Sequence, residues 1–273
     1  MKNDMQMIIR DFPGEIAVYA VADIHYGAIL HNEAGWERFC NQILQEPNAY
    51  LILHGDLINN SVRGSVGTGV FEDIRPSEQK NRMAEMLRPL QERILCMVPG
   101  NHEARSSKDT DDCPLYDIAC RIDCEDIYRE NAAFLSLRIG KRNNSEKANS
   151  NQSYKFAVVH GSGGGTLTGG GVNKAENFAR NFENLDCLVV GHVHKGFVTR
   201  PQKLVLDGRN GKVVKRDILV VSAVSWMNYG GYALQKMLNP SSNSVPQKLI
   251  LKNNTHRSVG NGDGRGKYIE VIW

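Results

Sequence analysis

Two pairs of residues in this 273-residue chain place potential metal ligands two positions apart. Asp23 pairs with His25 and His192 with His194, and each pair follows a short apolar run that is typical of a buried strand. In an extended segment, side chains two positions apart point to the same side, so both members of a pair can reach one ion. Carboxylate and neutral imidazole are common ligands of first-row divalent metals. For either pair alone, a polar turn after a strand is the alternative.

Three further apolar runs end in residues of the same kind. Asp56 stands in a His-Gly-Asp sequence, Asn101 in Gly-Asn-His-Glu, and His160 in His-Gly. His102, next to Asn101, is placed to face a bound substrate. Because ligand sites in open α/β sheets lie at the carboxyl ends of the strands, we expect all five loops to converge.

The combined set is too large for a single tetrahedral zinc ion. Four histidines, two aspartates and one asparagine fit two ions about 3.5–4 Å apart, with one carboxylate between them. Because the donors are nitrogen and oxygen without thiolate, the set suits Mn²⁺, Fe or Zn²⁺.

Regular elements must hold these loops in place. Buried apolar runs predict strands at residues 16–22, 50–53, 94–98, 155–159 and 185–190. Amphipathic spacing predicts helices at residues 34–44, 78–91, 114–122 and 174–182. Further along the chain, the Asp-Gly-Arg-Asn-Gly sequence predicts a hairpin turn at residues 207–211, and closing strands are expected at residues 247–251 and 267–272. We expect one domain over residues 1–273, with the motif core at 16–200 and a β-rich C-terminal layer at 201–273.

The composition is that of an ordinary globular protein, with 41% hydrophobic and 23% charged residues. The formal net charge of +3 suits an anionic substrate but is too small to indicate nucleic-acid binding by itself. Residues 1–12 lack the apolar segment of a signal peptide, and no run reaches membrane-spanning length, so we expect a cytoplasmic protein without a membrane partner. Six cysteines then indicate reduced thiols, with a small zinc site at Cys113, Cys120 and Cys124 as the alternative.

Two loops border the expected site. Arg63 lies in a stretch rich in Gly, Ser and Val, and it is a candidate for binding the substrate phosphate; a solvated surface arginine is the alternative. Residues 161–171 contain seven glycines, which indicates either a flexible loop or one whose amides border an anionic ligand.

Taken in chain order, D-x-H, G-D, G-N-H-E, H-G and G-H-x-H resemble the motifs of the calcineurin-like metallophosphoesterase superfamily. The motifs run from Asp23 to His194, and their combination is highly specific. The resemblance implies a layered α/β fold, in which a β-sandwich of two mixed sheets is flanked by helices.

The resemblance also implies roles for individual residues. The side chains that match the ligands of one metal are Asp23, His25 and His194. Those that match the ligands of the other metal are Asn101, His160 and His192. Asp56 would bridge the two ions, and His102 would contact the scissile phosphate and protonate the leaving group. Mn²⁺ is the expected ion, with Fe, Zn²⁺ or Ni²⁺ as alternatives.

The implied activity is metal-dependent hydrolysis of phosphate esters by a hydroxide that bridges the two ions. Protein Ser/Thr phosphatases of this superfamily carry Asp-Arg-Gly after the second Asp, whereas residues 56–60 here read Asp-Leu-Ile-Asn-Asn. This departure weakens the resemblance to the protein phosphatases. The intact D-x-H and G-H-x-H motifs also resemble the nuclease and phosphodiesterase branch of the superfamily, so we expect a phosphodiesterase acting on a nucleotide, RNA or DNA, with exonuclease-like activity included. A phosphomonoesterase for small molecules or phosphoproteins is the alternative, and a scaffold without catalysis is a remote one because such proteins lose ligands. The oligomeric state stays open.

Overall fold

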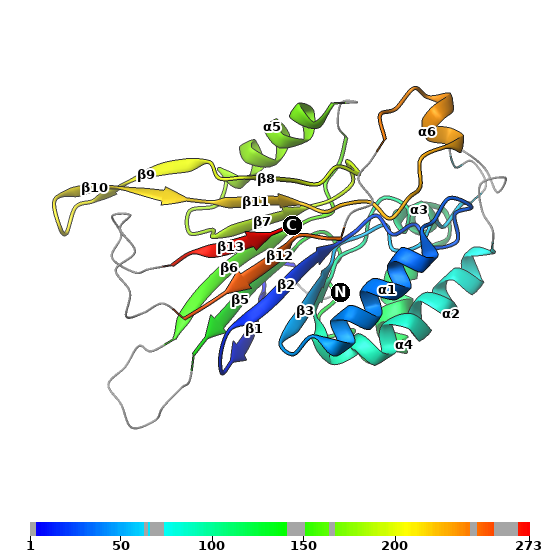
Figure 1. Ribbon diagram of the computed structural model, residues 1–273, viewed down its shortest axis with the longest axis horizontal. Helices are drawn as coiled ribbons and strands as arrows, with labels where there is room; N and C mark the ends of the chain where they lie inside the picture. The colour runs from blue at the N-terminus through cyan, green and yellow to red at the C-terminus, as the bar shows by residue number, and fades with distance from the viewer. Residues whose placement is uncertain are drawn as a thin grey trace.

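The computed structural model describes residues 4–62, 65, 74–140, 151–163, 167–240, 245–253 and 267–273. Its strands form two large sheets and one separate hairpin (Figure 1). The six-stranded sheet has the order β1 (Met7–Phe12), β5 (Ala133–Ile139), β6 (Gln152–Val158), β7 (Cys187–Val190), β11 (Leu219–Ser222), β8 (Phe197–Thr199). The five-stranded sheet has the order β13 (Ile269–Ile272), β12 (Lys248–Leu251), β2 (Ile16–Val21), β3 (Ala49–Leu53), β4 (Ile94–Met97).

Seven helical segments accompany the sheets in the described part of the chain. They are α1 (Glu33–Gln45), α2 (Pro76–Leu87), the 3-10 helix η2 (Arg88–Arg93), α3 (Ala104–Thr110), α4 (Pro114–Arg121), α5 (Thr168–Ala179) and α6 (Gly231–Gln235). The helices expected at residues 34–44, 78–91 and 114–122 are confirmed, the second of them divided between α2 and η2.

Helix α5 begins six residues before its expected start at 174, within the glycine-rich stretch. Its buried residues Gly171, Ala175 and Ala179 lie on one face. A Cβ atom at Gly171 would lie 3.2 Å from the side chain of Val193, so the glycine allows the helix to approach the loop after β7. Tertiary packing therefore outweighs the low helix propensity of glycine here.

Alternating side chains of the six-stranded sheet face two different layers. In β6, Phe156 and Val158 belong to the main core, which also contains Val18 of β2 and Trp36 of α1. Ala157 belongs to a second core, which α5 covers. Because residues alternate across a strand, the sheet packs against the other sheet on one face and against α5 on the opposite face. The predicted fold class, two mixed sheets flanked by helices, is confirmed.

The parallel strands of each sheet end at a common edge. In the five-stranded sheet β2 pairs parallel with β3 and β3 with β4. In the six-stranded sheet β6 pairs parallel with β7 and β7 with β11. The motif residues follow β2, β3, β4, β6 and β7, which places them at carboxyl ends, as the sequence predicted.

The C-terminal strands are divided among all three sheets. The expected hairpin is confirmed as β9 (Gln202–Asp207) with β10 (Lys212–Asp217), a separate antiparallel pair that extends away from the body of the molecule (Figure 1). β11 lies between β7 and β8, and β12 pairs with β2. None of the helices in the described ranges is long and apolar enough to cross a membrane.

Candidate metal centre

The structure brings the predicted ligands together in two groups that share one carboxylate. Within each group, potential ligand atoms lie within 4.8 Å of one another. One group consists of Asp23, His25, Asp56 and His194. The other consists of Asp56, His160 and His192, and Asn101 lies against it. The member common to both groups is Asp56, the residue expected to bridge two ions.

In the first group, the potential ligand nitrogen and oxygen atoms lie close together. Nε2 of His25 lies 3.0 Å from Nε2 of His194, and Nε2 of His194 lies 3.3 Å from Oδ1 of Asp23. Nε2 of His25 is also 3.9 Å from Oδ2 of Asp56. Oδ1 of Asp23 is buried and has no hydrogen-bond partner among the described residues. A buried carboxylate oxygen without a donor, beside two imidazole nitrogens, fits a divalent cation.

The second group is arranged around the amide of Asn101 and the carboxylate of Asp56. Nε2 of His160 lies 3.3 Å from Oδ2 of Asp56 and 3.1 Å from Oδ1 of Asn101. Nδ1 of His192 lies 2.6 Å from the same amide oxygen. Nδ1 of His160 donates to the carbonyl of His54 at 2.8 Å, which directs Nε2 toward the centre.

Each carboxylate is oriented by one main-chain N–H group. The amide of His192 donates to Oδ2 of Asp23 at 3.0 Å, and the amide of His102 donates to Oδ1 of Asp56 at 2.8 Å. The opposite oxygens, Oδ1 of Asp23 and Oδ2 of Asp56, are therefore the ones that face the histidines. This arrangement leaves them for metal coordination.

The backbone of the ligand loops adopts the left-handed conformation at five of the seven predicted ligands. The φ angles are 54° at Asp23, 51° at His25, 53° at Asp56, 71° at His192 and 56° at His194. Such conformations cost about 1–3 kcal/mol each in residues other than glycine and cluster at functional sites. Asp and His tolerate this region better than most residues. The loops after β2, β3 and β7 thus turn sharply after their strands and direct ligands inward.

Gly100 and Gly191 permit the ligand loops to approach one another closely, because glycine has no Cβ atom. A Cβ at Gly100 would lie 2.1 Å from Oδ1 of Asp56, and a Cβ at Gly191 would lie 3.0 Å from Oδ2 of Asp23. Any larger residue at Gly100 would displace the shared carboxylate.

Glu103 is a residue whose role the sequence did not reveal, although it completes the Gly-Asn-His-Glu motif. Its side chain is only 1% exposed. Oε1 accepts from the amides of Leu57 at 2.7 Å and Ile58 at 3.2 Å. Oε2 accepts from the amides of Asp56 at 2.9 Å and Gly100 at 2.8 Å. Glu103 therefore holds the loop of Asp56 against the loop of Asn101.

His102 lies beside the two groups. Its ring makes an edge contact with the ring of His25, with 4.3 Å between the centroids, and its Nε2 is 3.8 Å from Oδ2 of Asp56. Its Nδ1 donates to the carbonyl of Asn59 at 2.7 Å. Burial lowers the pKa of His102 to about 4, and nearby Asp56 only partly offsets this, so the ring is neutral near pH 7.

The charges of the centre are strongly coupled. Burial by itself would raise the pKa of Asp23, but His194 lowers it to about 2. For Asp56, the lowering by His160 and His102 likewise exceeds the effect of burial, and its pKa lies well below the usual range. In turn, although burial opposes it, Asp56 raises the pKa of His160 and Asp23 raises that of His194. Without metal, protons on these histidines compensate the carboxylates, and a divalent ion would replace them.

Of the remaining candidates, only the three cysteines lie wholly within the described residues. Arg63 lies outside the described residues, as do residues 164–166 of the glycine-rich loop. The thiols of Cys113, Cys120 and Cys124 belong to neither ligand group found in the described part of the chain.

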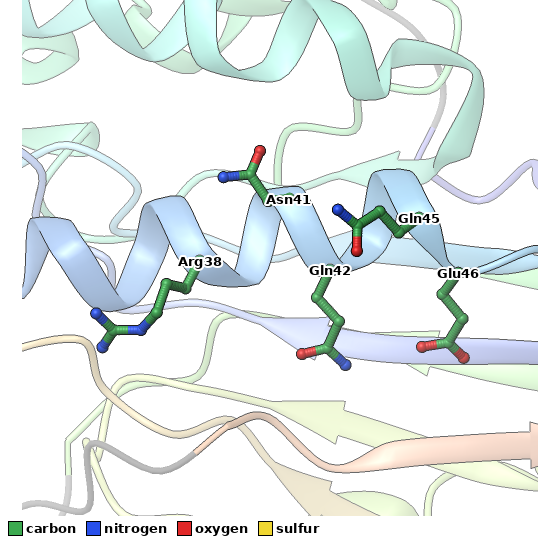
Figure 2. A pocket seen from close by; sticks show the side chains of 5 residues that line it. All are labelled: Arg38, Asn41, Gln42, Gln45 and Glu46. Atoms are coloured by element: carbon green, nitrogen blue, oxygen red, sulfur yellow. The ribbon is translucent and has the colours of Figure 1, made fainter.

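A shallow hollow lies along the second half of α1, away from the ligand groups. Five polar side chains line it, namely Arg38, Asn41, Gln42, Gln45 and Glu46 (Figure 2). Glu46 accepts a hydrogen bond from Tyr19 at 2.7 Å and pairs with Lys248 at 2.6 Å, so it ties α1 to β2 and β12.

Comparison with known proteins gives one family match. The model of the family described as calcineurin-like phosphoesterase matches residues 16–196, which is well over half of the chain. No curated protein matches. Among solved structures, the chain is similar to a metallophosphoesterase from Sphaerobacter thermophilus, with 12% identity, a TM-score of 0.40, and coverage of 94% of this chain and 89% of that one. A predicted phosphoesterase from Streptococcus pneumoniae has 13% identity, a TM-score of 0.31, and coverage of 94% and 97%. A cold-active protein-tyrosine phosphatase from a Shewanella species has 12% identity, a TM-score of 0.34, and coverage of 99% and 83%.

Proposed function

The chain belongs to the calcineurin-like phosphoesterase family, and we propose that it hydrolyses phosphodiesters of nucleotides or nucleic acids at a two-metal centre. The observation that carries the proposal is the position of Asp56, whose carboxylate is common to both groups of potential ligands. A phosphoric ester hydrolase is what the family implies.

The donor sets assign one ion to each group. Asp23, His25 and His194 would hold one ion. Asn101, His160 and His192 would hold the other. Asp56 would contact both, and the nitrogen and oxygen donors suit Mn²⁺, Fe or Zn²⁺. Two such ions would neutralise charge on the phosphoryl oxygens and lower the pKa of a water held between them.

The protein's own residues would orient the substrate. The ring of His102 lies at the edge of the centre, held by Asn59, and is placed to contact the scissile phosphate. Glu103 fixes the loops that carry Asp56 and Asn101, so the ligands are preorganised before substrate arrives.

The stretch after Asp56 weighs against a phosphoprotein substrate. The Asp-Arg-Gly of protein phosphatases is absent from residues 56–60. Asn60 instead is buried, and its side chain donates to the carbonyl of His102 at 2.8 Å and to Ser106 at 2.9 Å. Asn60 therefore holds the loop of His102 in place, and residues 56–60 offer no arginine side chain for binding a phosphoprotein.

The test is Mn²⁺-supplemented hydrolysis of bis-p-nitrophenyl phosphate against p-nitrophenyl phosphate. We expect a higher kcat/KM for the diester, and His102→Ala should lower kcat about 10²–10³-fold, as expected for loss of one electrostatic contact to the reacting group, while it keeps both metals. Preference for the monoester would contradict the diester assignment and favour the phosphomonoesterase. Absence of stoichiometric metal in purified, metal-supplemented protein would contradict the two-metal centre and indicate a scaffold.

A further inference from the structure

We propose that Arg105 is a positioning residue that holds His102 as a neutral ring with its proton on Nδ1. Arg105, held against His102, would then stabilise the leaving group by its positive charge, without proton transfer from Nε2 of His102. The catalytic part of this inference rests on the proposed function, because it places His102 against the phosphate. It changes one expectation from the sequence, namely that His102 protonates the leaving group.

Arg105 contacts both His102 and the residue that holds it. One terminal nitrogen of its guanidinium lies 2.8 Å from Nε2 of His102, and the other donates to the carbonyl of Asn59 at 3.1 Å. The same carbonyl accepts from Nδ1 of His102 at 2.7 Å. The three residues thus form a closed set of hydrogen bonds around the imidazole ring.

The chemistry of the two partners fixes the position of the ring proton. A carbonyl oxygen can only accept a hydrogen bond, so Nδ1 of His102 must carry a proton. A guanidinium can only donate and keeps its charge at all ordinary pH values, so Nε2 must accept through its lone pair. His102 is therefore neutral, and Nε2 has no proton to give.

A main-chain hydrogen bond also connects Arg105 to His102. Arg105 lies in the first turn of α3, and its amide donates to the carbonyl of His102 at 3.2 Å. The same carbonyl accepts from the side chain of Asn60 at 2.8 Å. The N-terminal turn of α3 thus fixes Arg105 relative to His102.

When the bond between phosphorus and the leaving oxygen breaks, the electron pair stays on that oxygen. The oxygen departs as an anion and takes its proton from water. The guanidinium of Arg105 lies against Nε2 of His102, which is itself 3.8 Å from Oδ2 of Asp56, so its positive charge is held at the edge of the centre and offsets the developing negative charge. The rate should therefore depend strongly on the acidity of the leaving group.

The first test locates the ring proton without measuring activity. Long-range ¹H–¹⁵N correlation NMR on the Zn²⁺-loaded protein, labelled at histidine, distinguishes the two neutral tautomers, and His102→Ala identifies the signal. We expect the Nδ1–H tautomer in the wild type and a shift toward a mixture in Arg105→Met. Arg93→Met is the matched control, because Arg93 also donates to main-chain carbonyls, those of Glu46 and Ala49, but lies outside the centre. A proton on Nε2 in the wild type, or no change in Arg105→Met, would overturn the inference.

The second test measures single-turnover hydrolysis of aryl phosphodiesters whose leaving groups differ in acidity. The wild-type rate should rise steeply with leaving-group acidity. Arg105→Met should lower kcat about 10–100-fold, with a smaller change in KM and unchanged metal content, whereas Arg93→Met should keep both constants. A wild-type rate independent of leaving-group acidity would overturn the charge-only role. If no ester is hydrolysed, the proposed function fails, and the NMR result still decides the positioning role.

Discussion

Replacing Glu103 by glutamine tests whether one buried carboxylate holds the centre together. The carboxylate accepts four main-chain hydrogen bonds, from Asp56, Leu57, Ile58 and Gly100. Glutamine keeps one acceptor oxygen, which can serve two of these amides. Its NH₂ group would face the other two, and a donor directed at a donor makes no hydrogen bond.

The expected loss of stability follows from these contacts. A hydrogen bond to a charged acceptor contributes about 1.5–3 kcal/mol, so losing two costs about 3–6 kcal/mol. Neutralising the side chain offsets part of this, because burial and the nearby charge of Asp56 raise the pKa of Glu103 and so disfavour its ionised form. We expect a net decrease of about 2–4 kcal/mol in the free energy of unfolding.

Urea denaturation of the metal-free protein measures this change, with Glu78→Gln as the matched control. Glu78 lies on the exposed side of α2 and pairs only with Arg82 among the ion pairs of the described residues, so its replacement should leave stability near the wild-type value. Metal affinity or activity of Glu103→Gln should fall about 10–100-fold, because the loops of Asp56 and Asn101 are no longer fixed to each other. Unchanged stability together with unchanged metal affinity would refute the reasoning.

Three further predictions concern metal binding and pH. Asp56→Ala should lose both ions, since its carboxylate belongs to both ligand groups; metal analysis that still finds two ions would contradict its bridging role. Because Asp56 raises the pKa of His160, outweighing burial, the metal-free imidazole is protonated to higher pH than usual, so metal affinity should rise with pH and binding should release protons. Calorimetry in buffers of different ionisation enthalpy detects that release, and identical heats would contradict it. Burial alone would raise the pKa of Glu46, but hydrogen bonds from Lys248 and Tyr19 outweigh burial and lower it. The contribution of the Glu46 carboxylate to the free energy of unfolding is therefore present above pH 4.5 and is lost as the pH falls through the lowered pKa. Glu46→Gln should therefore destabilise the protein at neutral pH and have little effect in strong acid, as urea titrations at the two pH values would show.

Much of the site follows from the sequence because metal ligation depends on residue type and local spacing. The D-x-H and G-H-x-H pairs and the three other strand ends predicted seven side chains, and the structure brings them all together. The strands were also predictable from local sequence. Runs such as residues 16–22 are apolar on both faces because neighbouring layers bury both faces.

Other features depended on contacts between residues far apart in the chain. The four bonds of Glu103 include three to a loop more than 40 positions away. The tautomer of His102 is set by Asn59 and Arg105, which sequence spacing does not bring together. The early start of α5 and the division of the C-terminal strands among the sheets likewise depend on which surfaces pack together.

The sequence by itself thus determined which side chains could bind metal and that they would follow strands, because both properties are encoded locally. Only the tertiary structure decided how those side chains are oriented, which ring nitrogen of His102 carries the proton, and which contacts hold the left-handed loops. Orientation and protonation depend on hydrogen-bond partners, and the partners become neighbours only when the two sheets and their loops assemble.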